Sequence, residues 1–153
     1  ITFELLADEA PKSVANFVTY AESNFYDKTV FHRVIPGFMI QGGGHTWTLA
    51  EKPGWDPIAN EAGNGVKNER GTLAVARTED PMSGANQFFI NLADNPELDH
   101  RDESPEGFGY AVFGRVVEGM EVVDEIAAVR TSAQKGFDDA PVKAVIIKSV
   151  IVV

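Results

Sequence analysis

The sequence consists largely of short apolar runs separated by polar stretches rich in glycine, proline and asparagine. The runs are rich in Val, Ile and Phe, and several alternate apolar with polar residues, as half-buried β-strands do. We expect about seven strands, at residues 1–5, 29–35, 38–41, 71–77, 86–92, 108–117 and 142–153. This pattern predicts a mainly β fold with long loops.

Two segments carry helical periodicity. Asp8 and Pro11 indicate a helix start, and a second short helix is expected at 118–129. The apolar residues of the first helix would share one face: Val14, Phe17, Val18 and Ala21. Because strands and helices do not alternate, we expect an antiparallel sheet closed into a barrel, in a single domain spanning 1–153.

Charge and composition exclude several classes of function. The chain has 23 acidic and 13 basic residues, which argues against binding nucleic acid or an anionic membrane surface. It has no cysteine, so disulfides and thiol chemistry are excluded. No apolar run is long enough to span a membrane. The three histidines, His32, His45 and His100, match no ligand spacing, and no metal is expected.

Other motifs argue against the commoner catalytic sites. Glycines 42–44 are not followed by a Lys-Ser/Thr pair and are interpreted as a turn. The GFGYAVFG stretch at 107–114 opens a strand rather than a helix, which argues against a dinucleotide site. No G-x-S-x-G motif is present. A distant pair of carboxylates, as in glycoside hydrolases, stays open on spacing alone.

A single arginine stands inside an apolar strand in FHRVIPGFMIQGGG, residues 31–44. Strand alternation would place Phe31, Arg33 and Ile35 on one face. Burying a cation without a partner is costly, so Arg33 either reaches solvent along its own stem or lines a groove. The residues alone leave these two interpretations open.

The same stretch, together with RGTLAVART, NQFFINLADN and GYAVFGRVVEGMEVVD, resembles the cyclophilin family of peptidyl-prolyl cis-trans isomerases. The stretch ANEAGNGVKNERGTLAVART is most similar to bacterial members. The resemblance covers nearly the whole chain and implies a closed, eight-stranded barrel capped by two helices. It also places the family's usual first strand upstream of Ile1, so that strand is expected to be absent here.

The resemblance implies a site position by position. The catalytic arginine falls on Arg33, with Gln41 beside it. The implied substrate-binding residues are Phe38, Met39, Ala76, Arg77, Thr78, Gln87, Phe89, Leu98 and Tyr110. The implied activity is rotation about X-Pro bonds in unfolded or flexible protein segments, which assists folding. No bond is broken, so no cofactor is expected.

The sequence departs from the family pattern at the border of the implied pocket. Glu97 stands where many relatives carry an aromatic residue that binds cyclosporin, so weak inhibition by cyclosporin is expected. We expect a monomer, in the cytoplasm or alternatively in the periplasm. Two other functions stay open: a module that holds proline-containing segments without turnover, and a barrel with an apolar ligand inside. The second is disfavoured because Phe31, Phe89 and Phe113 are expected to fill the interior.

Overall fold

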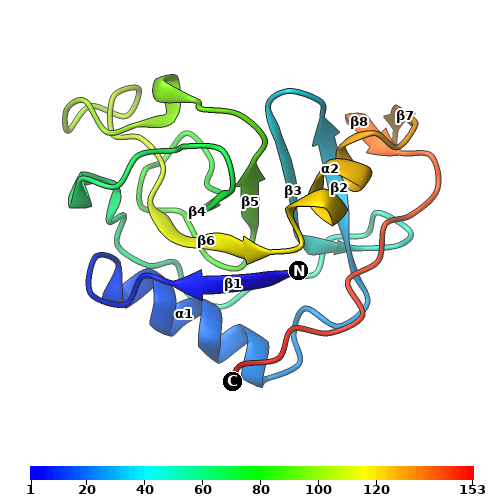
Figure 1. The fold of residues 1–153 in the computed structure, drawn as a ribbon, viewed down its shortest axis with the longest axis horizontal. Coiled ribbons are helices and arrows are strands. Elements are labelled where there is room, and N and C mark those ends of the chain that lie inside the picture. The colour runs from blue at the N-terminus through cyan, green and yellow to red at the C-terminus, as the bar shows by residue number, and fades with distance from the viewer.

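The computed structural model describes all residues, 1–153, and shows a curved antiparallel sheet and two helices (Figure 1). Six strands form the main sheet in the order β1-β6-β4-β5-β3-β2. Their bounds are β1 Thr2–Leu5, β2 Thr29–Ile35, β3 Met39–Thr46, β4 Thr72–Val75, β5 Phe88–Asn91 and β6 Val112–Glu118. A separate hairpin contains β7, Thr131–Gln134, and β8, Phe137–Pro141. The prediction of a mainly β, antiparallel fold is confirmed.

Three details of the predicted barrel are wrong. The structure has eight strands rather than about seven, so the expectation of an absent first strand has no support. The sheet is not closed by hydrogen bonds, because its edge strands β1 and β2 do not pair with each other. The predicted closing strand at 142–153 runs beside β2 instead, where the Phe31 amide donates to the Val145 carbonyl at 3.0 Å. The backbone of this segment is not a regular strand and makes only a few hydrogen bonds with the chain around β2.

The long helix α1, Pro11–Glu22, buries its predicted apolar face, with Phe17 and Ala21 in the core. Asp8 does not cap this helix, which begins after Ala10 without a side-chain cap from that residue. Glu61 from a distant loop supplies the acceptor, since its carboxylate accepts hydrogen bonds from the backbone amide and hydroxyl of Ser13 at 2.6 and 2.7 Å. A carboxylate at this end also opposes the positive end of the helix dipole.

The second helix, α2, Met120–Ala127, packs against β2 and β3 and buries Val123. Two 3₁₀ turns, η1 at Ala62–Asn64 and η2 at Pro96–Leu98, lie in the loops. Both predicted helices are therefore present.

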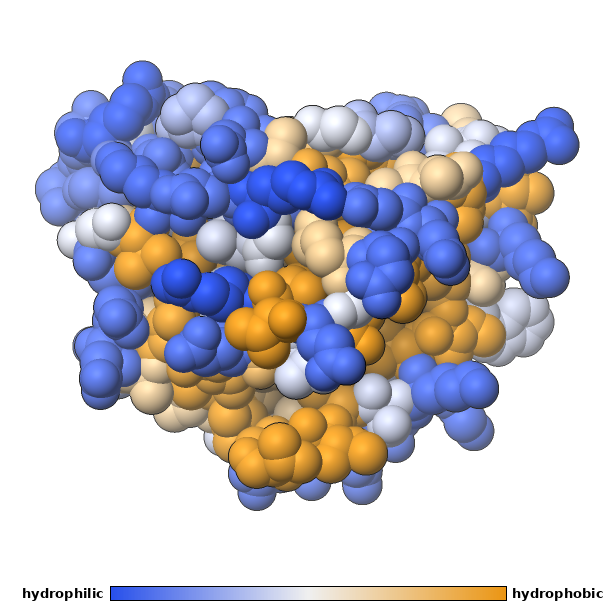
Figure 2. Space-filling view, viewed as in Figure 1, coloured by the Kyte–Doolittle hydropathy of each residue, from blue (hydrophilic) through white to orange (hydrophobic).

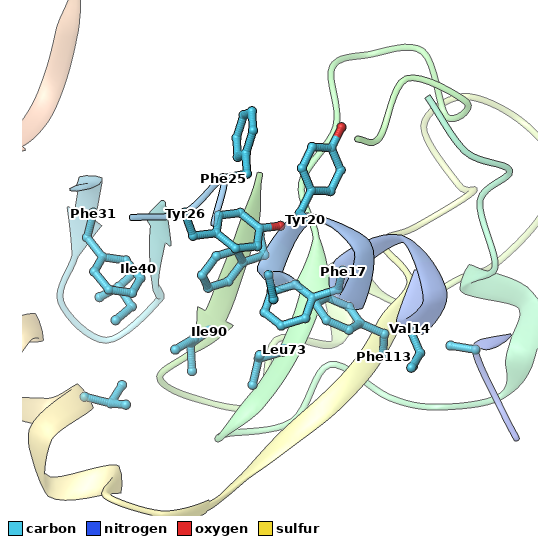
Figure 3. Close-up of a cluster of buried hydrophobic side chains, with 14 of the residues drawn as sticks. Val14, Phe17, Tyr20, Phe25, Tyr26, Phe31, Ile40, Leu73, Ile90 and Phe113 are labelled. Atoms are coloured by element: carbon cyan, nitrogen blue, oxygen red, sulfur yellow. The ribbon is translucent and has the colours of Figure 1, made fainter. Parts of the chain in front are cut away.

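Aromatic rings fill the space between α1 and the sheet (Figure 3). Phe17 packs within 5.5 Å, centroid to centroid, of the rings of Tyr26, Phe88 and Phe113. Phe89, predicted from the sequence to fill this interior, lies on the opposite face of the sheet, because strand alternation places Phe88 inside instead. An interior occupied by side chains leaves no room for the apolar ligand that the sequence left open.

Candidate active site

Arg33 is placed by a bulge in β2. Phe31 pairs with Gly42 and Arg33 with Gln41, so three residues of β2 oppose two of β3. The extra residue reverses the alternation, so Phe31 enters the main core and Arg33 is exposed. The predicted shared face of Phe31, Arg33 and Ile35 is therefore wrong at Phe31, because a regular strand was assumed.

A row of polar side chains extends from Arg33 across the sheet. One guanidinium N–H of Arg33 donates to Gln41 Oε1 at 3.5 Å, and Gln41 Nε2 donates to Gln87 Oε1 at 3.0 Å. No carboxylate lies within ion-pair distance of Arg33. Its charge is therefore available to a ligand.

Gly44, the third residue of the glycine run, leaves room for Gln87 in the polar row. A Cβ on Gly44 would lie 2.4 Å from Cγ of Gln87, so any side chain there would displace the glutamine. Glycines 42–44 are part of strand β3 rather than the predicted turn. Glycine at position 44 thus leaves the space in which the Gln87 side chain lies.

Beside the polar row, five apolar and aromatic residues predicted to bind the substrate lie together in one small cluster. Met39 and Phe89 are its buried members, at 2% and 4% exposure, and three half-buried side chains pack against it: Phe38, Leu98 and Tyr110. The Phe89 and Tyr110 rings meet edge to face, with centroids 5.7 Å apart. These residues form a small apolar cluster, here called the proline pocket after its predicted role, on the same sheet as the unpaired cation of Arg33.

Arg77 joins the two loops that border this pocket. Its guanidinium donates to the carbonyls of Gly109 at 3.0 Å and Thr78 at 2.8 Å, and lies 4.4 Å from the centroid of the Tyr110 ring. Its side chain is therefore committed to the protein itself. Ala76 is buried and its amide donates to the Gln87 carbonyl, whereas Thr78 is exposed and its hydroxyl bonds to Ser83.

Comparison with known proteins identifies the family that carries this site. The family model described as "Cyclophilin type peptidyl-prolyl cis-trans isomerase/CLD" matches residues 1–152. The chain is 53% identical over 149 residues to "Peptidyl-prolyl cis-trans isomerase cyp18" of Streptomyces antibioticus, covering 97% of this chain and 90% of that protein. It is 51% identical over 152 residues to "Peptidyl-prolyl cis-trans isomerase B" of Escherichia coli (strain K12), covering 99% and 93%.

The chain belongs to the cyclophilin family. Its activity is peptidyl-prolyl cis-trans isomerisation, and proline-containing peptides are its substrates. The fold agrees with a solved cyclophilin type isomerase of Cryptosporidium parvum, in the presence of the dipeptide Ala-Pro, at a TM-score of 0.80 and 29% identity. That match covers 96% of this chain and 88% of the other.

The border of the pocket in this cyclophilin is acidic. Glu97 is exposed next to Leu98, and the loop 99–107 lies at the hydrophilic upper left of the molecule (Figures 1 and 2). Within it, the Ser104 hydroxyl and amide both donate to Asp102, which holds the pKa of that carboxyl below its usual value. The loop is thus a structured border rather than a loose tail.

Sequence reasoning missed three buried asparagines that lie next to the pocket: Asn68, Asn91 and Asn95. The available signal was a polar residue inside an apolar strand, since Asn91 follows FFI in β5 as Arg33 follows FH in β2. No helix of the structure has the length and hydropathy needed to cross a bilayer. No three potential metal-ligating side chains gather at one place.

Proposed function

We propose that Arg33 and the apolar pocket beside it form the catalytic site of this cyclophilin. The observation that carries the proposal is a guanidinium with no carboxylate partner, two residues along β2 from Ile35. Ile35 pairs with Met39 and packs against the apolar cluster of Phe38, Met39 and Phe89. The pocket would hold the prolyl ring, and the cation would act on the bond that rotates. Leu98 and Tyr110 would complete the wall of the pocket.

The chemistry requires a hydrogen-bond donor at one atom. Rotation abolishes amide resonance, with a barrier of about 18–20 kcal/mol. In the twisted transition state the prolyl nitrogen regains a localised lone pair, which it lacks in the planar ground state. An arginine is always protonated and donates only, so Arg33 would bind the transition state more tightly than either planar isomer. That difference in affinity accelerates rotation in both directions.

Gln41 and Gln87 would orient the donor and the substrate backbone. Gln41 accepts from Arg33 at 3.5 Å and donates to Gln87, so its amide would direct the guanidinium without holding it firmly. The strand end at Ala76, Arg77 and Thr78 lies next to Gln87 and would border the backbone on either side of the proline. Such an open border suits unfolded or flexible segments, which we propose as the substrates in protein folding.

The test is the rate of cis-to-trans isomerisation of an Ala-Pro-Phe peptide with the wild-type protein and with Arg33→Ala. We expect kcat/KM to fall about 10²- to 10³-fold, as when one preorganised donor is removed from a transition state. Arg115→Ala is the matched control, because Arg115 is also an exposed arginine on a strand, in β6. A rate for Arg33→Ala near that of the wild type would reject this assignment of the donor; peptide binding without turnover in the wild type would indicate a holding function instead.

We further propose that this cyclophilin is a cytoplasmic monomer that cyclosporin inhibits only weakly. The exposed carboxylate of Glu97 beside Leu98 supports weak inhibition, since an apolar inhibitor gains nothing from a charged neighbour. Size-exclusion chromatography with light scattering tests the oligomeric state, and a mass near 33 kDa, about twice that of the 16.6 kDa chain, would contradict the monomer.

A further inference from the structure

A chain of three buried asparagine amides runs beneath the proposed proline pocket. Asn68, Asn91 and Asn95 are exposed by only 1%, 0% and 5%. Nδ2 of Asn95 donates to Oδ1 of Asn91 at 2.9 Å, and Nδ2 of Asn91 donates to Oδ1 of Asn68 at 3.0 Å. All the donors point the same way, so each amide polarises the next.

Both ends of this chain reach backbone carbonyls of pocket residues. Nδ2 of Asn95 also donates to the carbonyl of Phe38 at 3.0 Å. At the other end, Nδ2 of Asn68 donates to the carbonyls of Leu98 at 3.1 Å and Tyr110 at 3.2 Å. Three pocket residues from three separate segments are therefore tied to one polar network.

Asn91, the central member of the asparagine network, is attached to the strands that carry the pocket. Asn91 lies on β5 directly opposite Met39 on β3, and its amide also donates to the hydroxyl of Thr72 on β4 at 3.0 Å. The network thus starts from the rigid sheet and extends to the segments that surround the pocket. The Phe38 and Leu98 carbonyls already accept the backbone amides of Leu92 and Tyr110, each at 2.9 Å. The asparagine amides add a second hydrogen bond to each carbonyl and so tie these segments to the sheet.

We infer that the Asn95–Asn91–Asn68 chain is a positioning device that sets the width of the proline pocket. The inference rests on the proposed function, because it assumes that the prolyl ring enters this pocket. None of the three side chains reaches the surface, so they act through Phe38, Leu98 and Tyr110 rather than on the substrate. An apolar residue in the middle would fill the space but leave Asn68 and Asn95 without their partner.

The device acts on binding rather than on the rotation step. Arg33 is held by the bulge in β2 and bonds to Gln41, outside the network. Breaking the network should therefore weaken binding of the prolyl ring in the ground and transition states alike. Loss of uniform binding raises KM and leaves kcat unchanged.

The experiment measures KM and kcat for the Ala-Pro-Phe peptide with Asn91→Leu, which removes the central amide at similar volume. Asn95→Ala is the second variant, because of the three pocket carbonyls it releases only that of Phe38 and it leaves the bond between Asn91 and Asn68 in place. Val123→Ala is the control: it removes buried methyl groups from the main core, away from the network. All assays are run well below the melting temperature of each variant, so that partial unfolding does not affect the measured KM and kcat.

We expect Asn91→Leu to raise KM about 5- to 10-fold and Asn95→Ala by less, with kcat within about twofold of the wild type. Val123→Ala should lower the melting temperature without moving KM. An unchanged KM in both asparagine variants would overturn the inference, and so would an equal KM rise in Val123→Ala. These outcomes differ from failure of the proposed site, in which Arg33→Ala would retain full activity whatever the asparagine variants do.

Discussion

At the level of single residues, the site depends on which side chains are committed to the protein and which are free. Arg33 has only a 3.5 Å contact with Gln41, whereas Arg70 forms two hydrogen bonds with Asp124, at 3.0 and 2.7 Å. An arginine held so firmly by a carboxylate cannot serve a transient acceptor. The absence of a carboxylate partner leaves the Arg33 guanidinium available to an acceptor, as its proposed catalytic role requires.

Glu97 gives a prediction about inhibition at the same scale. Replacing Glu97 by tryptophan should strengthen inhibition by cyclosporin about tenfold, because an aromatic surface would replace a solvated charge beside Leu98. Inhibitor titrations of wild-type and variant protein measure the change. Glu103→Trp, in the same loop, is the control and should have no such effect. Submicromolar inhibition of the wild type would show that Glu97 does not weaken binding.

At the level of elements, the bulge in β2 decides that Phe31 faces the main core and that Arg33 is exposed. It requires glycine at position 42, where a Cβ would lie 2.8 Å from the Val30 carbonyl oxygen and 2.9 Å from Cδ1 of Phe31. Gly42→Ala should therefore lower the free energy of unfolding by about 1–3 kcal/mol, the usual cost of overpacking.

Chemical denaturation measures that loss, and Gly37→Ser, at a turn where a Cβ would meet nothing within 4 Å, is the comparison. Gly37 has a φ of +75°, so Gly37→Ser is expected to cost backbone strain alone. Peptide isomerisation by Gly42→Ala should also fall, because a shifted bulge moves Arg33. Wild-type activity and wild-type stability in Gly42→Ala would contradict the prediction, because β2 and β3 would then accommodate a side chain at the bulge.

The two loops beside the pocket depend on Arg77 in a similar way. Arg77→Lys keeps the charge but loses the planar fork that bonds Gly109 and Thr78 and covers Tyr110. We expect KM for the peptide to rise severalfold with little change in kcat, since Tyr110 loses its support behind the pocket.

Arg101→Lys is the matched control, because Arg101 bonds the Glu106 carbonyl in the same loop without contacting Tyr110. Steady-state kinetics of both variants give the comparison. An equal rise in KM in the two variants would contradict the prediction, because it would mean that Arg77 only stabilises the loop in general.

At the level of the whole molecule, the β7–β8 hairpin is joined to the main sheet over two buried histidines. The rings of His32 and His45 lie 4.2 Å apart, and the Phe137 ring of β8 packs within 5.2 Å of each. Burial, with smaller contributions from His45 and Arg33, lowers the pKa of His32 to about 3 from its ordinary value of 6.5. Burial also lowers the pKa of His45, against a smaller opposing effect of Glu51.

These pKa shifts predict loss of stability in acid. Between pH 6.5 and 3 the unfolded chain binds a proton at His32 that the folded protein does not, so acidification favours unfolding. The contribution is complete above pH 6.5 and declines as the pH falls through this window. In His32→Leu the free energy of unfolding should change less over this range, as measured by denaturation at several pH values. His100→Leu is the control, and an identical pH dependence in wild type and His32→Leu would contradict the prediction.

The distribution of surface hydropathy also belongs to the whole molecule. Exposed apolar side chains gather along the C-terminal segment: Val142, Ile146, Ile151, Val152 and Val153. Figure 2 shows this apolar area on the lower side, next to the C-terminus, and the polar loops of the pocket border at the opposite corner. The backbone of this segment bonds to Arg130 at Val142 and to residues 28–31, at the start of β2, through Val145 and Ile147.

The sequence by itself determined the family, the mainly β fold and the positions of both helices. Each of these rests on local periodicity or on contiguous motifs, such as the apolar face of α1 or the stretch from Phe31 to Gly44. The same motifs predicted the pocket residues, which the structure brings together, while their catalytic roles stay predictions.

Only the tertiary structure decided the details on which the mechanism depends. The bulge that moves Phe31 into the core arises from pairing between β2 and β3, which alternation along one strand does not contain. The asparagine network and the partners of Arg77 join residues that are far apart in the sequence. Such contacts depend on how distant segments meet in space, and a backbone carbonyl that needs a donor leaves no mark on the sequence.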